Sequence, residues 1–139
     1  MSISSFKQIS IEKNIVLPLE SFDIEDINRV TITTTPKGCH MIKTTKETSS
    51  EGQILTGTKI IVQFNANILI NYTALNTEQS IHTYNITVPF SHFVVIDHNI
   101  GEYANIEPVI EIEDIKYSLI DKKTAYVNAM GLLKIKGLN

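Results

Sequence analysis

The sequence predicts an all-β fold, either an antiparallel β-sandwich or a partly open barrel, with about seven strands and one short helical turn. Three observations indicate this class. Apolar and polar residues alternate in seven or so segments, turn residues separate the segments, and helical spacing of apolar residues is almost absent. The connections are too short for the helical crossovers that parallel strands need, so we expect antiparallel pairing.

The longest alternating stretch is KIIVQFNANILINYTA, residues 59–74, with apolar side chains at the even positions and mostly polar ones at the odd positions. Successive side chains of an extended chain point to opposite faces, so this stretch has one apolar and one polar face. Sixteen residues would span roughly 50 Å, which is long for a globular strand. We favour a bend that crosses between sheets and keeps the even face inward; the alternative is a turn near Asn65 or Asn67.

Before this stretch, we expect a first strand with apolar residues at alternate positions, Lys13 on the same face, and an end at Pro18. Ile24 and Ile27 are three residues apart, which predicts one short turn of helix within residues 21–29. The short helical turn of the predicted fold rests on this spacing.

A Thr-rich strand is expected over residues 30–34, because β-branched side chains favour a pleated surface. The Pro-Lys-Gly sequence at residues 36–38 predicts a turn in which Gly38 takes a positive φ. Residues 39–45 would then form the returning arm of a hairpin, followed by an exposed polar loop over residues 46–53.

In the second half of the chain, residues 75–79 predict a polar turn and residues 84–96 a strand. Pro89 lies inside that strand, which an edge strand or a crossing between sheets would tolerate. Residues 97–108 are the longest loop candidate.

The apolar phase then slips by one residue between Ile112 and Ile115, near Asp114, as a β-bulge would make it do. A last strand is expected over residues 125–135, with Gly131 at a kink.

The tetrapeptide Ile-Glu-Asp-Ile occurs twice, at residues 24–27 and 112–115. The flanking sequences do not align, and the patterns predict a different conformation for each copy. We therefore interpret the repetition as chance.

Composition and charge narrow the function classes. The 139 residues fit a single domain, residues 1–139, large enough for a core without disulfides. A net charge of −3 with interleaved signs gives no basic stripe, so nucleic acid is not an expected partner. No apolar run approaches the roughly 20 residues of a membrane-spanning helix. The amino terminus shows no secretory signal, so we expect synthesis in the cytoplasm without a signal peptide.

Cys39 is the single cysteine, which excludes an intramolecular disulfide and a multi-thiolate zinc site. Free cysteines are usually buried, so an inert, half-buried thiol is the main interpretation. An intermolecular disulfide through Cys39 is the alternative.

No constellation of residues indicates catalysis or metal binding. Glu111, Glu113 and Asp114 are close in sequence, but the alternation puts both glutamates on the outer, solvated face of a strand. There is no nucleophile elbow and no Gly-rich phosphate loop. The histidines lack the paired spacing of metal ligands; they are His40, His82, His92 and His98. We expect a non-enzymatic protein without cofactors or metals.

Four segments occur in a fixed order: IVLPLESFDIEDINRVTIT, SSEGQILTGTKIIVQFNANILINYTA, EQSIHTYNITVPFSHFVVI and VIEIEDIKYSLIDKKTAYVNAMGLL. Together they resemble the SPOCS domain, a β-rich module of endospore-forming bacteria found in proteins of spore morphogenesis and of the spore's outer layers. The resemblance covers about residues 9–135. Phe64-Asn65 stands where the family usually has a glycine, which leaves the local bend open. Some members also carry a peptidoglycan-binding LysM module, and from the length of this sequence we expect none beside the domain.

The resemblance implies a bare module without catalytic residues, which acts in building or docking. Our first hypothesis is a structural protein of the spore surface, a coat, exosporium or appendage subunit. It would form a homo-oligomer or polymer by strand-edge addition and contact other spore-layer proteins, with Cys39 linking chains in an oxidising layer.

Two alternatives remain. The first is a monomeric adaptor that binds another spore morphogenetic protein through a single exposed apolar patch. The second is a carbohydrate-binding β-sandwich, suggested by five tyrosines: Tyr72, Tyr84, Tyr103, Tyr117 and Tyr126.

Overall fold

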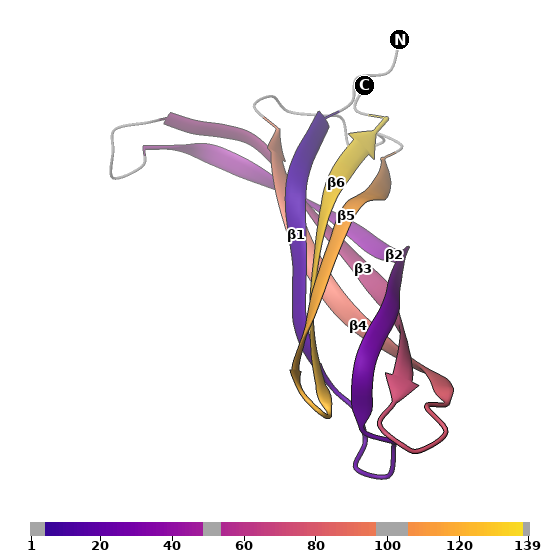
Figure 1. The fold of residues 1–139 in the computed structure, drawn as a ribbon. Helices are drawn as coiled ribbons and strands as arrows, with labels where there is room; N and C mark the ends of the chain where they lie inside the picture. Colours follow the sequence, from indigo (N-terminus) through magenta and orange to yellow (C-terminus); the bar gives the residue numbers. More distant parts are fainter. Residues whose placement is uncertain (1–4, 49–53, 97–105, 138–139) are drawn as a thin grey trace.

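The structure, a computed structural model, describes residues 5–48, 54–96 and 106–137 and consists there of strands and short connections (Figure 1). Its strands form two three-stranded antiparallel sheets. Sheet A has the order β1-β6-β5, and sheet B has the order β2-β3-β4. The strands are β1 (Ser5–Val16), β2 (Ile24–Thr48), β3 (Ile54–Ala74), β4 (Ile81–Ile96), β5 (Glu107–Asp121) and β6 (Thr124–Lys136).

The two sheets pack face to face as a sandwich, which confirms the predicted fold class. Contacts between the sheets join β1 to β4 and β2 to β5, so the edge strands of one sheet lie near those of the other. The paired ends of β2 and β3 extend beyond the other strands as a projecting hairpin (Figure 1). The strands number six instead of about seven, because the two short strands expected within residues 30–45 are parts of β2.

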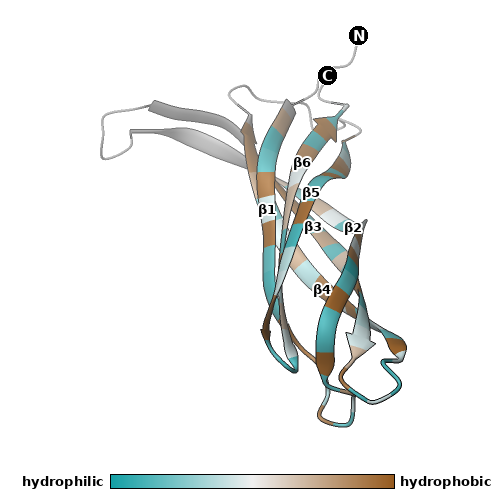
Figure 2. Cartoon of the chain, viewed as in Figure 1, coloured by the Kyte–Doolittle hydropathy of each residue, from teal (hydrophilic) through white to brown (hydrophobic). Residues whose placement is uncertain are grey.

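The core is built around β3, the central strand of sheet B. Its even-numbered residues from Ile60 to Ala74 are all buried, whereas its odd-numbered residues from Lys59 to Thr73 are partly or fully exposed. Figure 2 shows the matching bands of hydrophobic and hydrophilic residues along the strands. Phe64 is the largest fully buried side chain, and its ring stacks on Phe90 at 5.9 Å between centroids. Packing of this apolar row against sheet A is the main source of stability.

The even face of β3 therefore stays inward from Ile60 to Ala74, as expected. The strand does not cross to the other sheet, and it does not turn at Asn65 or Asn67; it stays paired with β2 and β4 in sheet B. Hydrogen bonding to a neighbour on each side explains how so long a strand stays extended past Asn65 and Asn67.

The predicted turn at residues 36–38 is wrong. β2 continues through it to Thr48, and the pairing passes from Pro36 opposite Phe64 to Gly38 opposite Gln63. Lys37 is thus the extra residue of a β-bulge. The adjacent Pro36 is tolerated because β2 is an edge strand with a bulge at this point. Gly38 does not adopt the positive φ that the turn required.

The predicted helical turn within residues 21–29 is also wrong, because β2 begins at Ile24. The register skips Glu25, so Ile24 and Ile27 are both buried although they lie three residues apart. In a regular strand this spacing would place them on opposite faces, whereas a bulge returns them to one face. The bulge therefore mimics the spacing of a helix.

The second Ile-Glu-Asp-Ile copy behaves in the same way, and this overturns the expectation of two different conformations. On β5, Ile112 pairs with Gly131 and Asp114 with Met130, so Glu113 is skipped. The predicted bulge near Asp114 is confirmed. In both copies the glutamate is the extra residue, and the two isoleucines turn toward the core.

The remaining expectations concern the connections. The turn after Ala74 is confirmed, and Gln79 in it has a φ of 49°. Pro89 lies in β4, which is an edge strand. Of the two settings expected for this proline, an edge strand and a crossing between sheets, the first is therefore correct. The expected loops over residues 46–53 and 97–108 fall largely outside the described residues. Among the described residues, no helix is long and apolar enough to cross a membrane.

Candidate functional site

The outer face of sheet B carries a broad surface without charged side chains, which we call the uncharged face. Four rows of outward residues cross its three strands in register. The spacing of strands and residues makes it about 20 Å long and about 10 Å wide. Its members are Thr31, Thr33, Thr35 and Gly38 on β2, Leu69, Asn67, Asn65 and Gln63 on β3, and Asn85, Thr87, Pro89 and Ser91 on β4.

Hydrogen bonds between side chains tie neighbouring strands together on this side of the sheet. Thr87 Oγ1 donates to Asn67 Oδ1 at 3.5 Å, and Asn71 Nδ2 donates to Thr83 Oγ1 at 3.4 Å. Asn28 Nδ2 lies 3.2 Å from Asn71 Oδ1. Amide and hydroxyl groups both donate and accept, so the surface can pair with many polar partners without charge.

The charges that border the uncharged face are cationic. Arg29 precedes it on β2, Lys37 lies at the bulge on its edge, and Lys59 lies beyond its other end on β3. The nearest acid along β2 is Asp26, opposite Thr73. The surface therefore has a positive border in a chain whose net charge is −3.

An aromatic ring concentrates positive charge beyond one end of the uncharged face. The Nζ atoms of Lys7 and Lys59 lie 4.3 Å and 4.2 Å from the centroid of the Phe93 ring. Lys7 Nζ also donates to the Phe93 carbonyl oxygen at 3.0 Å. These cation–π contacts hold both ammonium groups beside an exposed aromatic side chain.

Two shallow hollows lie along the outer side of sheet B. One, of about 310 Å³, lies beside the bulge at Gly38. It is lined by Lys37, Gln63, Phe64, Pro89, Phe90 and Ser91. The other, of about 540 Å³, lies between Arg29, Leu69 and Thr83. Both hollows are open and have mixed polar and apolar linings, which suit side chains of a partner protein better than a buried cofactor.

The outer face of sheet A has a different character. Acidic residues of β1 and β5 flank an uncharged row on β6 that runs from Tyr126 to Leu132. Lys134 Nζ pairs with Glu111 Oε1 at 2.9 Å, and Tyr126 donates to Glu12. The acids are Glu12, Glu111, Glu113 and Asp114, against the cations Lys116 and Lys134.

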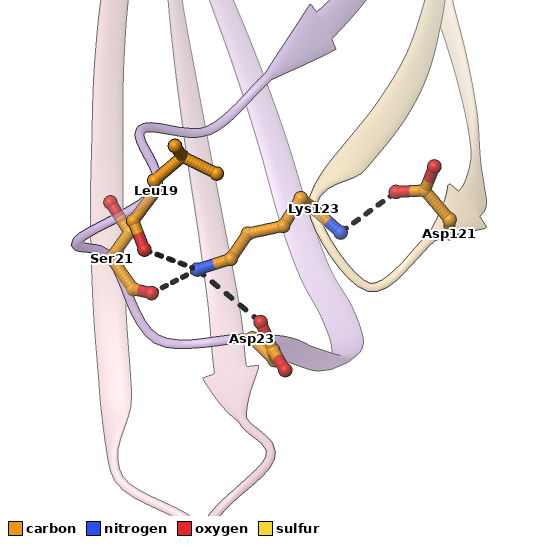
Figure 3. A network of polar contacts seen from close by, with 5 residues as sticks. All are labelled: Leu19, Ser21, Asp23, Asp121 and Lys123. Atoms are coloured by element: carbon orange, nitrogen blue, oxygen red, sulfur yellow. Dashed lines mark hydrogen bonds and ion pairs between the residues drawn. The ribbon is translucent and has the colours of Figure 1, made fainter.

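At the end of the sandwich where β5 turns into β6, Lys123 holds the β1–β2 connection in place (Figure 3). Its Nζ contacts Asp23 Oδ1 at 3.3 Å and donates to the carbonyls of Leu19 and Ser21. Its backbone amide donates to Asp121 Oδ1 at 2.9 Å, and this bond lowers the pKa of the Asp121 carboxyl. These contacts fix the turn and the loop against each other.

The same end exposes apolar side chains, which we call the apolar tip: Leu19, Phe22, Leu75 and Ile81. Leu19 is 92% exposed and Phe22 51%. The Phe22 ring lies 4.7 Å from the imidazole of His82, and the Leu75 amide donates to the Asp23 carbonyl at 2.8 Å. The apolar tip is thus held in place by the same connection that Lys123 binds.

Cys39 lies on the inner side of β2, opposite Val62, where it is half-buried against the core. Burial raises the pKa of its thiol. A raised pKa lowers the thiolate fraction at neutral pH, and the thiolate is the form that exchanges disulfides.

The residues weighed for metal binding or catalysis are dispersed. His40 is on the outer side of sheet B, His82 and His92 are on the inner side of β4, and His98 falls outside the described residues. Glu111 is paired with Lys134 and Glu113 sits at the β5 bulge. Among the described residues, no three potential ligands gather into a metal-sized group.

The tyrosines do not share one surface. Tyr72 and Tyr84 point inward from sheet B, Tyr117 lies on the inner side of β5, and Tyr126 is on the outer face of sheet A. Tyr103 falls outside the described residues. The four described tyrosines therefore form no common aromatic platform of the kind that would stack on a sugar.

The sequence contains a sign of the uncharged face that apolar alternation alone does not reveal, namely three stretches without charged residues. Residues 30–36, 60–77 and 79–96 contain no Asp, Glu, Lys or Arg. Pairing of β2, β3 and β4 then places these charge-free stretches side by side. The Lys123 contacts left no comparable signal, because they join residues about a hundred positions apart.

Comparison with known protein families shows that the SipL, SPOCS domain model matches residues 23–120 of this chain. The chain belongs to the SPOCS domain family. The matched segment includes β2, β3 and β4, and therefore the whole uncharged face, together with nearly all of β5. It is shorter at both ends than the resemblance over residues 9–135. No curated protein and no solved structure matches the chain significantly.

Membership of the SPOCS domain family relates this protein to sporulation. The match reaches neither β1 nor β6, although both complete the core of the sandwich. The SPOCS domain segment thus contains one complete sheet and one edge strand of the other.

Proposed function

We propose that this SPOCS domain protein is a non-enzymatic structural subunit of the bacterial spore surface, in the coat, the exosporium or an appendage, and that it associates with copies of itself. The uncharged face is the observation that carries the proposal. Exposed sheet faces of monomeric proteins usually hold charges, whereas the centres of protein interfaces are depleted of them. Membership of a sporulation-related family supports a role in the bacterial spore.

Association through a face fits this molecule better than the strand-edge addition suggested by the sequence. β2 contains Pro36 and several bulges, β4 contains Pro89, and β5 contains a bulge. On β1, Lys13 occupies the same side as the buried isoleucines. Each of these features hinders the pairing of a free edge with another strand.

An intermolecular disulfide through Cys39 remains a secondary part of the proposal. Its inward position and raised thiol pKa would make this cross-link slow, because little thiolate is available to a second chain. Association should therefore begin without oxidant, and reductant should not prevent it.

Sedimentation velocity over a concentration series, with and without reductant, tests the proposal. We expect the mean mass of the wild-type protein to rise with concentration in both conditions. Thr33→Glu/Thr87→Glu places two like charges in one exposed row of the uncharged face and should reduce this association at least tenfold. Thr77→Glu/Lys122→Gln makes the same net charge change at exposed turns and should associate as the wild type does. A wild-type chain that stays monomeric throughout would overturn the proposal.

The apolar tip favours a second candidate function, a monomeric adaptor that binds another spore morphogenetic protein. Its rigid attachment through Lys123 would lower the entropy cost of binding an apolar groove. Leu19→Ser/Phe22→Ser should then abolish capture of one partner from sporulating cells and leave the mass of the free chain unchanged. An unchanged set of captured proteins would exclude this candidate.

A further inference from the structure

We infer that the uncharged face of one molecule stacks on the outer face of sheet A of a second copy, so that copies add head to tail into an open filament. The inference rests on the proposed self-association and identifies the surface of the partner copy. Because the two contacting surfaces differ, each molecule of a bound pair keeps its other surface free, and the pair exposes one surface of each kind.

Charge argues against contact between two uncharged faces. Arg29 and Lys59 lie at opposite ends of this surface, and Lys37 lies at its edge. If two copies met face to face with strands antiparallel, Arg29 of one would approach Lys59 of the other. With strands parallel, β2 of each copy would lie over β4 of the other, and the two Lys59 side chains on the central strands would approach each other. Both arrangements bring like charges together at the border, which disfavours association.

The outer face of sheet A has an excess of acidic over basic side chains around a similar centre, with Lys116 and Lys134 among its four acids. It is also three strands wide, and its middle strand presents the uncharged row from Tyr126 to Leu132. Glu12 lies on one side of this row, and Asp114 with the bulged Glu113 on the other. Stacking would place the acidic border of sheet A against the cationic border of the uncharged face.

The size of the contact suits a repeating assembly. Three strands and the rows from Arg29 to Ile42 on β2 define roughly 600 Å² on each partner, from the usual strand spacings. About 1,200 Å² in total is the lower end of specific interfaces. A single contact of this size is weak, so stacks should form only at high protein concentration. Contacts between unlike surfaces do not close on themselves unless a rotation makes a ring.

A mixing experiment with two blocked variants tests the inference. Thr33→Glu/Thr87→Glu blocks the uncharged face, and Asp114→Lys/Ser118→Lys blocks the outer face of sheet A; all four positions are exposed. Thr77→Lys/Glu78→Lys changes the net charge as much as the second variant does, but at the β3–β4 turn. Circular dichroism and thermal unfolding confirm that each variant is folded before sedimentation equilibrium is measured.

We expect each blocked variant alone to remain at the monomer mass of 15.6 kDa. The turn control should assemble as the wild type does. The equimolar mixture of the two blocked variants should reach twice the monomer mass and no more. Association of the Asp114→Lys/Ser118→Lys variant to the same mass as the wild type would overturn the inference and leave self-association standing. A monomeric wild-type chain would overturn both.

Discussion

At the scale of single residues, Gly131 shows how closely β6 approaches β5 at the β5 bulge. A Cβ atom built on Gly131 would lie 3.0 Å from the Glu111 carbonyl oxygen and 3.6 Å from Ile112 Cδ1. The oxygen belongs to the backbone and cannot rotate away. We expect Gly131→Ala to lower the free energy of unfolding by about 1–3 kcal/mol, as overpacked sites do, measured by urea denaturation.

Gly38 is the matched control for this substitution. Its Cβ would meet only the flexible end of Gln63, at 3.6 Å, and its φ is one that alanine adopts. Gly38→Ala should therefore change the free energy of unfolding by less than about 1 kcal/mol. Equal losses for both substitutions would show that the close approach at Gly131 is not the cause.

His92 gives the fold a pH dependence. Burial and the nearby Lys7 charge lower the imidazole pKa from 6.5, against a smaller raising effect from a hydrogen bond with the Ser10 backbone. The folded state thus binds fewer protons than the unfolded state below pH 6.5, so its stability falls as the pH is lowered from 6.5 toward the folded pKa. Urea denaturation at pH 7.5 and 5.5 should show this loss, and His92→Gln should make it smaller. A wild-type protein with equal stability at both pH values would contradict this assignment.

At the scale of elements, the regular parts of the fold were predictable and the irregular parts were not. The alternation in β3 and the phase slip on β5 placed the core residues of both strands correctly, because period-two burial leaves a direct trace in the sequence. The bulges on β2 were missed. Pro36 with Gly38 looks like a turn, and Ile24 with Ile27 looks like a helix, unless the partner strand is known.

Pro89 acts at this scale by protecting the free edge of β4. The pairing of β4 with β3 is regular at Pro89, so its nitrogen must face the open edge, where no β3 acceptor needs a donor. Pro89→Thr should restore an outward N–H, keep the fold and increase thioflavin-positive aggregation several-fold on prolonged incubation. Val95→Thr introduces the same side chain on the same face of β4 without changing a backbone N–H, and it serves as the control. Equal aggregation of both variants would exclude this role.

At the scale of the whole molecule, the sequence predicted the sandwich but not the difference between its two outer faces. That difference depends on strand order, which brings the charge-free stretches of β2, β3 and β4 together and leaves the acids of β1 and β5 on the other sheet. Local patterns do not carry strand order. The charge-free stretches are visible in the sequence, but only the strand order shows that they form one face.

Electron microscopy of the concentrated wild-type protein, with helical reconstruction of any filaments, tests the stacking most directly. Sheets within a sandwich and sheets stacked between copies are both about 10 Å apart, so each subunit should advance the filament by about 20 Å along the stacking direction. The reconstruction should place the β2-β3-β4 sheet of one copy against the β1-β6-β5 sheet of the next. Filaments joined through strand edges, or isolated particles at every concentration, would contradict the stacking.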